Sequence, residues 1–482
     1  MSILRKIGFS SNGLGKYSAV YILLFLMFPM ALLPSCISDD ITDSPSATLT
    51  FSTDTVNFGA IFTDLGTPTA RLKVYNRNAK GVNISSIRLR NSESPFRLNV
   101  DGVSGDSFSD VEIRGNDSIY VFLECFIKAD DSNEPFRIAD QLEFVTNGVT
   151  QDVEIEAWGW NVTRLKSLTV EDDMILTSLR PYVIFDTLRV MPGATLKVEP
   201  GAWLLFHDKA QMEIQGSLLA IGEPGNFIRM SGDRLDDILP DVAYDQLAGQ
   251  WGGLNFTQES FGNRMEYVNM RSTVSGLRVD SCGDLSKNKL TLVNCWLHNS
   301  QSNVLNSKYS AVDAYGCCFS EAAGSVVKLT GGLHNFVQCT IANAYLFASL
   351  HQPNLYLEHC LPENMEDNDQ PLMTANFENG IVWGEIGDPL YPGELIGSNV
   401  FMLNMLFKAN GSDDENFINC VWNEDPLYNT IREDYYFDYT LQPDSPAIGK
   451  GNPAYLNSES LYDMLGVYRL LNGLPALGAY AE

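Results

Sequence analysis

The pattern of apolar and polar residues divides the chain into one long apolar run followed by two regions of short strands. The apolar run extends from Ala19 to Leu33, follows three basic residues and stops just before Cys36. It contains Pro29 and is shorter than the ~20 residues that a membrane-spanning helix needs. This order predicts a secretory signal peptide over residues 1–35 rather than an uncleaved membrane helix.

Between residues 48 and 160, apolar and polar residues alternate in short segments that are separated by turns rich in Asn, Gly and Asp. Alternation of period two is typical of strands that bury one face. About seven such strands over roughly 110 residues predict an immunoglobulin-like β-sandwich. Residues 36–47, which are short and polar, are expected to form a tether in front of it.

From residue 161 the pattern changes to short apolar strands between glycine-containing turns, such as Pro192-Gly193-Ala194 and its repeat at Pro200-Gly201-Ala202. A longer repeat is marked by segments that end at Met270, Cys295, Cys318, Cys339, Cys360, Ile381 and Cys420. Most steps are 21 to 25 residues, and no helical period intervenes. An all-β chain of this kind predicts a right-handed parallel β-helix with a C-terminal cap over residues 161–482. The period continues to about residue 440, which allows about a dozen turns.

The cysteines of this repeat suggest how the coil is filled. Equivalent residues of a β-helix stack about 4.8 Å apart, and an inward-facing column favours slim apolar side chains such as thiols. We therefore predict a buried ladder of free thiols at Cys295, Cys318, Cys339, Cys360 and Cys420. No Cys-x-x-Cys pair supports a metal site, and disulfides between adjacent rungs are the alternative. Asn269 and Asn294 precede ladder residues, which predicts the start of an asparagine ladder at a turn.

The stretch Leu33-Pro34-Ser35-Cys36 resembles the bacterial lipobox, in which the cysteine becomes the lipid-modified first residue of the mature protein. Ser38, Asp39 and Asp40 resemble the export signal of surface lipoproteins of the Bacteroides group, although a solvated linker is the alternative. The resemblance implies an acyl anchor such as palmitate on Cys36, in the outer membrane and facing the cell exterior. Several acyl chains hold a protein durably, whereas one chain holds it only marginally.

Two further regions carry the resemblance. Residues 48–160 are similar to the immunoglobulin-like modules that begin many Bacteroides-group surface lipoproteins, and residues 165–482 resemble right-handed β-helix surface proteins related in fold to pectate lyases. The closing motifs are Asp425-Pro426-Leu427, Ser445-Pro446-Ala447-Ile448-Gly449, Asp463, Gly466, Arg469 and Gly478-Ala479-Tyr480. Thr55, Ser118 and Thr187 each follow an aspartate and precede an apolar residue. This resembles the sites that the same bacteria O-glycosylate.

The charge of the chain limits its partners. The net charge is −28, and removal of the signal segment with its three basic residues leaves about −31. Nucleic acid is excluded as a partner because phosphates require basic patches. Acidic polysaccharides are disfavoured unless calcium bridges the two charges. The expected partners are the membrane, through the lipid anchor, and a glycan or an outer-membrane protein, with no cofactor or with calcium alone.

Candidate catalytic groups are few. Asp236-Asp237 and Asp413-Asp414 lie in polar segments, where solvated turns are expected rather than acid–base pairs. The alternative is a polysaccharide lyase or glycoside hydrolase, in which the acids of residues 362–369 bind calcium and Lys328 or Arg278 removes a proton. Lys308, Lys328 and Arg278 look scattered along the chain. The histidines at 298, 334, 351 and 359 show no spacing typical of metal ligands.

The segment from residue 232 to residue 251 interrupts the repeat. Insertions in solenoids gather where partners bind, so this segment is either an arm for a partner or a plain surface loop. We expect a non-catalytic surface lipoprotein that presents a β-helix to a glycan or an envelope protein.

Overall fold

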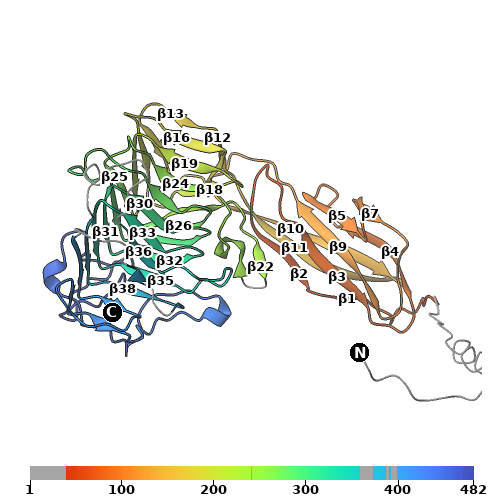
Figure 1. Ribbon diagram of the computed structural model, residues 1–482. Helices are drawn as coiled ribbons and strands as arrows, with labels where there is room; N and C mark the ends of the chain where they lie inside the picture. The colour runs from red at the N-terminus through yellow and green to blue at the C-terminus, as the bar shows by residue number, and fades with distance from the viewer. Residues whose placement is uncertain (1–39, 240–241, 359–372, 387–389, 392–398, 482) are drawn as a thin grey trace, which may run out of the picture. The chain divides into compact units, whose positions relative to one another are not determined.

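The computed structural model describes residues 40–239, 242–358, 373–386, 390–391 and 399–481 (Figure 1). Contacts divide the chain into two compact units. The first holds the chain up to residue 56 with residues 69–123 and 140–154, and the second holds residues 57–68, 124–139 and 155–482. In the described part of the chain, no helix is both long enough and apolar enough to span a membrane.

Antiparallel strands form between residues 50 and 160, where alternation predicts them. One sheet has the order β1 (Thr50–Phe51), β3 (Ala70–Asn76), β9 (Asp117–Cys125), β5 (Phe96–Val100) and β6 (Val103–Gly105). The other has the order β2 (Thr55–Phe62), β11 (Val149–Trp160), β10 (Phe136–Thr146), β4 (Val82–Leu89) and β7 (Ser107–Phe108), with β8 (Val111–Ile113) also paired to β4. Burial alternates along β9, as a strand with one buried face requires. The immunoglobulin-like assignment stays a prediction.

Parallel strands form three long sheets from residue 163 onward, so this region is a parallel β-helix (Figure 1). The eleven-stranded sheet contains β12 (Thr163–Lys166), β15 (Tyr182–Phe185), β18 (Trp203–Phe206), β21 (Ile228–Gly232), β26 (Val268–Thr273), β29 (Trp296–Ser300), β32 (Cys318–Ala322), β35 (Thr340–Asn343), β38 (Ile381–Gly384), β41 (Leu406–Phe407) and β43 (Val421–Trp422). The nine-stranded sheet contains β13 (Thr169–Val170), β16 (Thr187–Val190), β19 (Gln211–Ile214), β24 (Gly253–Phe256), β27 (Leu277–Val279), β30 (Leu305–Lys308), β33 (Val327–Thr330), β36 (Leu355–Glu358) and β39 (Leu390–Tyr391). The ten-stranded sheet contains β14 (Met174–Leu176), β17 (Thr195–Val198), β20 (Ser217–Ile221), β25 (Asn263–Glu266), β28 (Leu290–Val293), β31 (Ala311–Tyr315), β34 (Leu333–Val337), β37 (Thr374–Glu378), β40 (Asn399–Leu403) and β42 (Phe417–Ile418).

The thiol ladder exists, but one of its predicted members is wrong, and Cys420 at its end is only partly buried. Strand registers place Val268, Cys295, Cys317, Cys339, Gly380, Met405 and Cys420 at equivalent positions of successive rungs. The N–H of Cys295 lies 3.4 Å from Sγ of Cys317. Cys318 was predicted in place of Cys317, yet it packs outside the coil beside Tyr439, because neighbouring residues of a strand point to opposite faces.

Two of the segment ends that mark the repeat are also displaced from this column. Met270 and Ile381 belong to neighbouring columns, because they pair with Leu297 and Thr340 respectively. Cys360 lies outside the described residues. The seven cysteines within the described part of the chain are all free thiols, in agreement with the preference for thiols over disulfides.

A column of left-handed residues precedes the thiol ladder. Its members are Tyr267, Asn294, Gly316, Gln338, Asn379, Asn404 and Asn419, with φ between 47° and 62°. Asparagine tolerates this conformation better than most side chains, which explains its recurrence at the turn. The predicted asparagine ladder is therefore confirmed at Asn294 and wrong at Asn269, which lies in strand β26 and pairs with Trp296.

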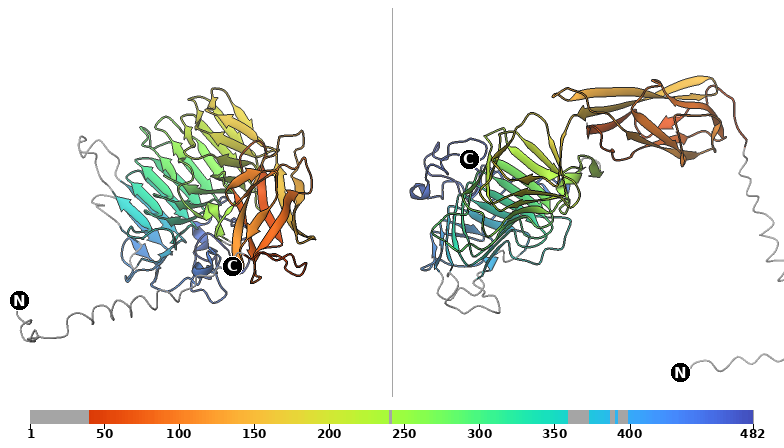
Figure 2. Two further views of the ribbon diagram at one scale, coloured as in Figure 1. Left: turned by 90° about the vertical axis from the view of Figure 1, so that its right-hand side faces the viewer. Right: turned by 90° about the horizontal axis from the view of Figure 1, so that it is seen from above.

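The coil ends earlier than the expected residue 440, because its last strand is β43. The rings of Phe407, Phe417 and Trp422 lie 5.3 to 5.9 Å apart in these last rungs. The following segment, residues 423–481, which we call the C-terminal segment, contains the short 3-10 helices η2 (Arg432–Asp434) and η3 (Pro453–Tyr455). It lies beside the coil, drawn in blue in Figure 2.

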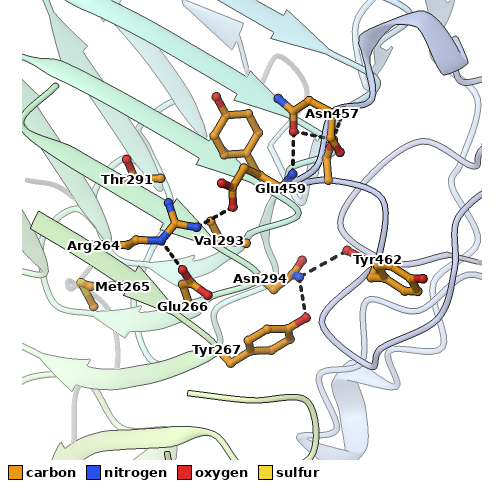
Figure 3. Close-up of polar contacts among 12 residues, drawn as sticks. Arg264, Met265, Glu266, Tyr267, Thr291, Val293, Asn294, Asn457, Glu459 and Tyr462 are labelled. Carbon is orange, nitrogen blue, oxygen red and sulfur yellow. Dashed lines mark hydrogen bonds and ion pairs between the residues drawn. The ribbon is translucent and has the colours of Figure 1, made fainter. Parts of the chain in front are cut away.

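Apolar and polar contacts fix the C-terminal segment to the coil. Tyr439, Met464, Ala479 and Tyr480 pack on Cys318 and Ala342 of the eleven-stranded sheet. Figure 3 shows the polar contacts at the ten-stranded sheet, where Arg264 forms an ion pair with Glu459. Beside it, Asn294 donates to the hydroxyl of Tyr267 (3.0 Å) and to the carbonyl of Tyr462 (3.3 Å).

The closing motifs noted in the sequence hold the end of this segment. Arg469 is buried and donates through Nη1 to Oε1 of Gln338 (3.2 Å) and to the carbonyl of Gly478 (3.1 Å). Buried Asp463 accepts hydrogen bonds from the backbone N–H groups of residues 465, 467 and 481 at 2.8 to 2.9 Å. The expected cap therefore lies along the flank of the coil.

Candidate functional site

The three sheets of the β-helix differ in how accessible their outer faces are. Several outward residues in the later rungs of the eleven-stranded sheet are buried, among them His298, Cys318, Thr340 and Ile381. They are covered in part by the C-terminal segment. The outward residues of the nine-stranded sheet stay partly exposed. A binding face for a long ligand is therefore better placed on the nine-stranded sheet than on the eleven-stranded sheet.

The insertion between β21 and β24 covers another part of the eleven-stranded sheet. It contains β22 (Asp237–Leu239), β23 (Val242–Ala243) and the 3-10 helix η1 (Tyr244–Gln246). Asp245 forms an ion pair with Arg271 of β26, and Asn299 donates to the carbonyl of Gln246. The base of the insertion is thus docked on the coil, while Ile238 and Leu239 of β22 are exposed.

A continuous row of polar and aromatic side chains runs along the outside of the nine-stranded sheet. Strand registers align each member with the next, one rung apart, and every member is partly exposed. The row consists of Arg189, Glu213, Asn255, Arg278, Asn306, Lys328 and Tyr356. At ~4.8 Å per rung its seven members extend over about 30 Å. We call these seven residues the polar row.

Neighbouring rungs hold one another in place at the first part of the polar row. Nε of Arg189 lies 3.0 Å from Oε1 of Glu213, which also accepts a hydrogen bond from Gln215 (2.6 Å). One rung further, Nδ2 of Asn255 donates to Oδ2 of Asp280 (3.2 Å). These contacts between rungs keep the long side chains extended along the face.

The far part of the polar row combines a cation with an aromatic ring. Nζ of Lys328 lies 4.6 Å from the ring centroid of Tyr356 and 3.5 Å from Oε2 of Glu358. The hydroxyl of Tyr356 donates to Oε1 of Glu358 at 3.4 Å. An amine and an aromatic ring in this arrangement present both a hydrogen-bond donor and a flat apolar surface to a ligand.

The electrostatics of the polar row do not favour Glu213 as a general acid. The hydrogen bond from Arg189 lowers the pKa of Glu213, although burial raises it, and Gln215 and the charges of Arg189 and Arg278 lower it further. A general acid at neutral pH needs a raised pKa instead. Glu213 and Glu358 are five rungs apart, about 24 Å, whereas paired glycosidase carboxylates lie within about 10 Å.

The cations that looked scattered in the sequence gather on this sheet. Arg278 and Lys328 are members of the polar row, two rungs apart, and Lys308 is exposed on the strand between them. The view of them as scattered is wrong, because insertions of unequal length hide the rung spacing from a count along the chain. A strongly acidic protein thus carries a local group of cations.

The acidic pairs take structural roles. Asp236 binds the guanidinium of Arg234 within its own loop. Asp413 and Asp414 accept hydrogen bonds from backbone N–H groups of residues 416 to 420. The acids of residues 362–369, which were considered for calcium, lie outside the described residues. In the described part of the chain, no group of three or more His, Cys, Asp or Glu side chains is arranged to hold a metal.

The histidines are placed as follows. His298 and His334 are buried, and burial lowers the pKa of both, that of His334 to about 4. His351 is exposed, and His359 lies outside the described residues. None of the four described histidines, His207 included, lies in the polar row.

The sequence-predicted anchor and modification sites are not brought together. Cys36, Ser38 and Asp39 lie outside the described residues, and Asp40 is exposed. Thr55, Ser118 and Thr187 are partly exposed residues in three different strands. Their roles stay predictions.

One buried acid escaped the sequence analysis. Glu321 of β32 is fully buried and accepts a hydrogen bond from the hydroxyl of Tyr439 in the C-terminal segment. Burial raises the pKa of Glu321 to about 7, although Ser320, Tyr439 and the backbone at Ala344 lower it. No sequence pattern marks this pair, because its members are 118 positions apart.

Comparisons with known proteins add little to this geometry. No family model matches the chain. No curated protein matches it either. Among solved structures, it is similar to a family 123 glycoside hydrolase from Clostridium perfringens, at 9% identity and a TM-score of 0.19, over 26% of this chain and 30% of that one. It is also similar to a protein of unknown function from Porphyromonas gingivalis W83, at 11% identity and a TM-score of 0.18, over 25% of this chain and 59% of the other. The chain thus spans less than two thirds of either structure, and TM-scores this low carry no argument about function.

Proposed function

We propose that this protein binds an extended glycan, without cleaving it, along the polar row of the nine-stranded sheet. The observation that carries the proposal is the register of the seven side chains from Arg189 to Tyr356. Their regular spacing suits a ligand that itself repeats, as a polysaccharide does. Amide, guanidinium, ammonium and aromatic groups are the kinds of side chain that hold hydroxyl-rich ligands.

The lack of cleavage is part of the proposal. The lowered pKa of Glu213 suits a carboxylate that stays ionised and accepts hydrogen bonds from hydroxyl groups. The distance of about 24 Å between Glu213 and Glu358 leaves them too far apart to act on one glycosidic bond. Binding therefore explains the polar row better than hydrolysis does.

We further infer a cell-surface lipoprotein of the outer membrane, anchored through acyl chains on Cys36 and exported by Ser38, Asp39 and Asp40. This inference is supported by the signal peptide pattern and by the lipobox resemblance. A protein tethered at the cell surface meets external glycans directly. The membrane, through the anchor, and the glycan are then its partners.

Glycan binding is tested with a panel of neutral and acidic polysaccharides on the purified mature protein. We expect retention of at least one extended glycan, and we expect Arg278→Ala with Lys328→Ala, or Tyr356→Ala alone, to weaken binding about tenfold. Lys197→Ala is the matched control, because Lys197 is an exposed cation of the ten-stranded sheet. Lys308→Ala is then added to the double variant. It should weaken the binding of acidic ligands further and leave the binding of neutral ligands unchanged, because only acidic ligands gain from the charge of Lys308.

Two results would contradict the proposal. One is a panel in which no glycan binds, or in which the polar-row variants bind as well as the control. The other is release of new sugar ends during incubation, which would show turnover and favour the lyase or glycosidase alternative.

Binding of an envelope protein is a second candidate, because the C-terminal segment exposes several large apolar residues close together. Tyr462, Leu465, Tyr468, Leu471 and Leu474 are between 39% and 73% exposed. Clustered exposed apolar residues mark protein-binding surfaces more often than scattered ones do. Replacing Leu465 and Leu471 by Ser should abolish recovery of a cross-linked membrane partner, and unchanged recovery would exclude this surface.

A further inference from the structure

A pocket of about 390 Å³ opens on the outer face of the eleven-stranded sheet, away from the polar row. It lies between strands β35 and β38 and residues 425–442 of the C-terminal segment. Pockets of roughly 300–1,000 Å³ are typical of small-molecule sites. From this pocket we propose a second binding site, for a single uncharged sugar unit.

Contacts within the protein hold the floor of the pocket in place. Asn343 bonds to both the N–H (3.3 Å) and the carbonyl (2.9 Å) of Ala322, so its amide fixes the sheet rather than a ligand. Tyr439 is 3% exposed, and its hydroxyl is held by Glu321 beneath it. The ring of Tyr428 meets that of Tyr439 edge to face, with centroids 5.0 Å apart. A pocket built on such fixed groups loses little conformational entropy when it binds a ligand.

One wall is aromatic. The indole of Trp383 is partly exposed and lines the pocket. Its ring lies 5.6 Å from Nζ of Lys408, and its own carbonyl accepts a hydrogen bond from Asn354 (2.7 Å), which fixes the backbone at this point. A flat indole surface beside hydrogen-bonding groups suits the apolar face of a sugar ring.

The rim offers both acceptors and donors. Glu385, Asp425 and Glu433 supply carboxylates, and Arg432 supplies a guanidinium. Nε of Arg432 donates to the carbonyl of Ala344 (3.2 Å), and its Nη1 lies 3.9 Å from Oε2 of Glu385. With Lys408 nearby, two cations offset two of the three rim carboxylates.

Such a mixed rim fits hydroxyl groups better than it fits a charged ligand. A sugar hydroxyl both donates and accepts, so it can use carboxylates and a guanidinium together. An anionic ligand would meet three carboxylates. A cationic ligand would meet the guanidinium of Arg432 and one carboxylate that the two cations do not offset, so glucosamine is the stricter of the two charged comparisons. The pocket also holds too little space for a long chain, so we infer one sugar unit, free or at a chain end.

The test uses methyl glycosides of glucose, galactose and mannose, with glucuronate and glucosamine as charged counterparts, in ligand-observed NMR. We expect at least one methyl glycoside to bind, and we expect Glu433→Gln to weaken its binding about threefold and Trp383→Leu about tenfold. Glu199→Gln is the matched control, because Glu199 is exposed in a turn several rungs away. Unchanged thermal unfolding identifies variants that fold normally.

Three outcomes would overturn this site. They are no binding by any methyl glycoside, tighter binding of a charged counterpart, and equal binding by Glu433→Gln and Glu199→Gln. Variants of the polar row, such as Arg278→Ala, should leave methyl glycoside binding unchanged. The pocket and the polar row therefore succeed or fail separately.

Discussion

The hydroxyl of Tyr439 donates a hydrogen bond to the buried carboxyl of Glu321. This contact attaches the C-terminal segment to strand β32 of the eleven-stranded sheet. Glu321 itself adopts a left-handed conformation, with φ of 51°, within β32. Because its pKa is raised to about 7, the carboxyl keeps its proton in the folded protein at mildly acidic pH.

This raised pKa predicts a specific pH dependence of stability. The unfolded side chain releases its proton near 4.5, so between pH 4.5 and 7 only the folded protein binds the proton. The contribution of Glu321 to the free energy of unfolding is fully present below pH 4.5. It is lost as the pH rises through 7, and the total loss is ~3 kcal/mol. Unfolding free energies at several pH values should show this loss in the natural protein and not in Glu321→Gln.

Comparison with Glu321→Gln is required because the titration of buried histidines changes stability with pH in the opposite direction. His334, with a pKa lowered to about 4, costs stability as the pH falls below 6.5. Both proteins share this effect, so it cancels in the difference between them. A difference that does not change between pH 5 and 8 would show that Glu321 does not titrate in this range.

Arg469 should be essential for attachment of the C-terminal segment. Arg469→Ala removes hydrogen bonds to Gln338 and to the carbonyls of Gly478 and Ala479, and it leaves buried acceptors without donors. We expect a loss of ~3 kcal/mol in unfolding free energy and earlier proteolysis of residues 423–482. Lys197→Ala should change neither measurement, and equal proteolysis of both variants would contradict this role.

Thiol labelling should distinguish the cysteines. Burial raises the pKa of Cys295, Cys317 and Cys318 well above the usual value of 9.0, and that of Cys125 to about 12. Since the thiolate is the reactive form, these four should resist iodoacetamide in the folded protein. Cys282 is partly exposed, so it should be labelled first. Peptide mapping measures each rate, and fast labelling of Cys317 would refute the ladder.

Cys36 should be the lipidated first residue of the mature protein. Cys36→Ala removes the thiol that carries the lipid, so we expect an unprocessed precursor or protein released from membranes. Cys125→Ala is the control, and it should keep normal processing. Membrane retention of Cys36→Ala after normal processing would exclude the lipoprotein assignment.

Intact-mass measurement of protein from its native source should show added sugar. The expected sites are Thr55, Ser118 and Thr187, and all three are partly exposed. Replacing each by Ala should remove one glycan mass. A native mass equal to that of the polypeptide and its lipid would dismiss these sites.

The sequence by itself determined the parallel coil and the antiparallel strands before it, because alternation and short repeats reflect which side of a strand is buried. It also determined that thiols line the coil. It did not separate Cys317 from Cys318. A shift of one residue moves a side chain to the other face of its strand, and a repeat aligned from the sequence alone is uncertain by one residue.

Only the tertiary structure decided the arrangement of the functional candidates. Arg278, Lys308 and Lys328 become neighbours because strand pairing sets the register, whereas loops of unequal length hide it in the sequence. The pocket and the Glu321–Tyr439 contact depend on the C-terminal segment folding back on the coil. Contacts between residues more than a hundred positions apart arise from packing, and local patterns carry no record of them.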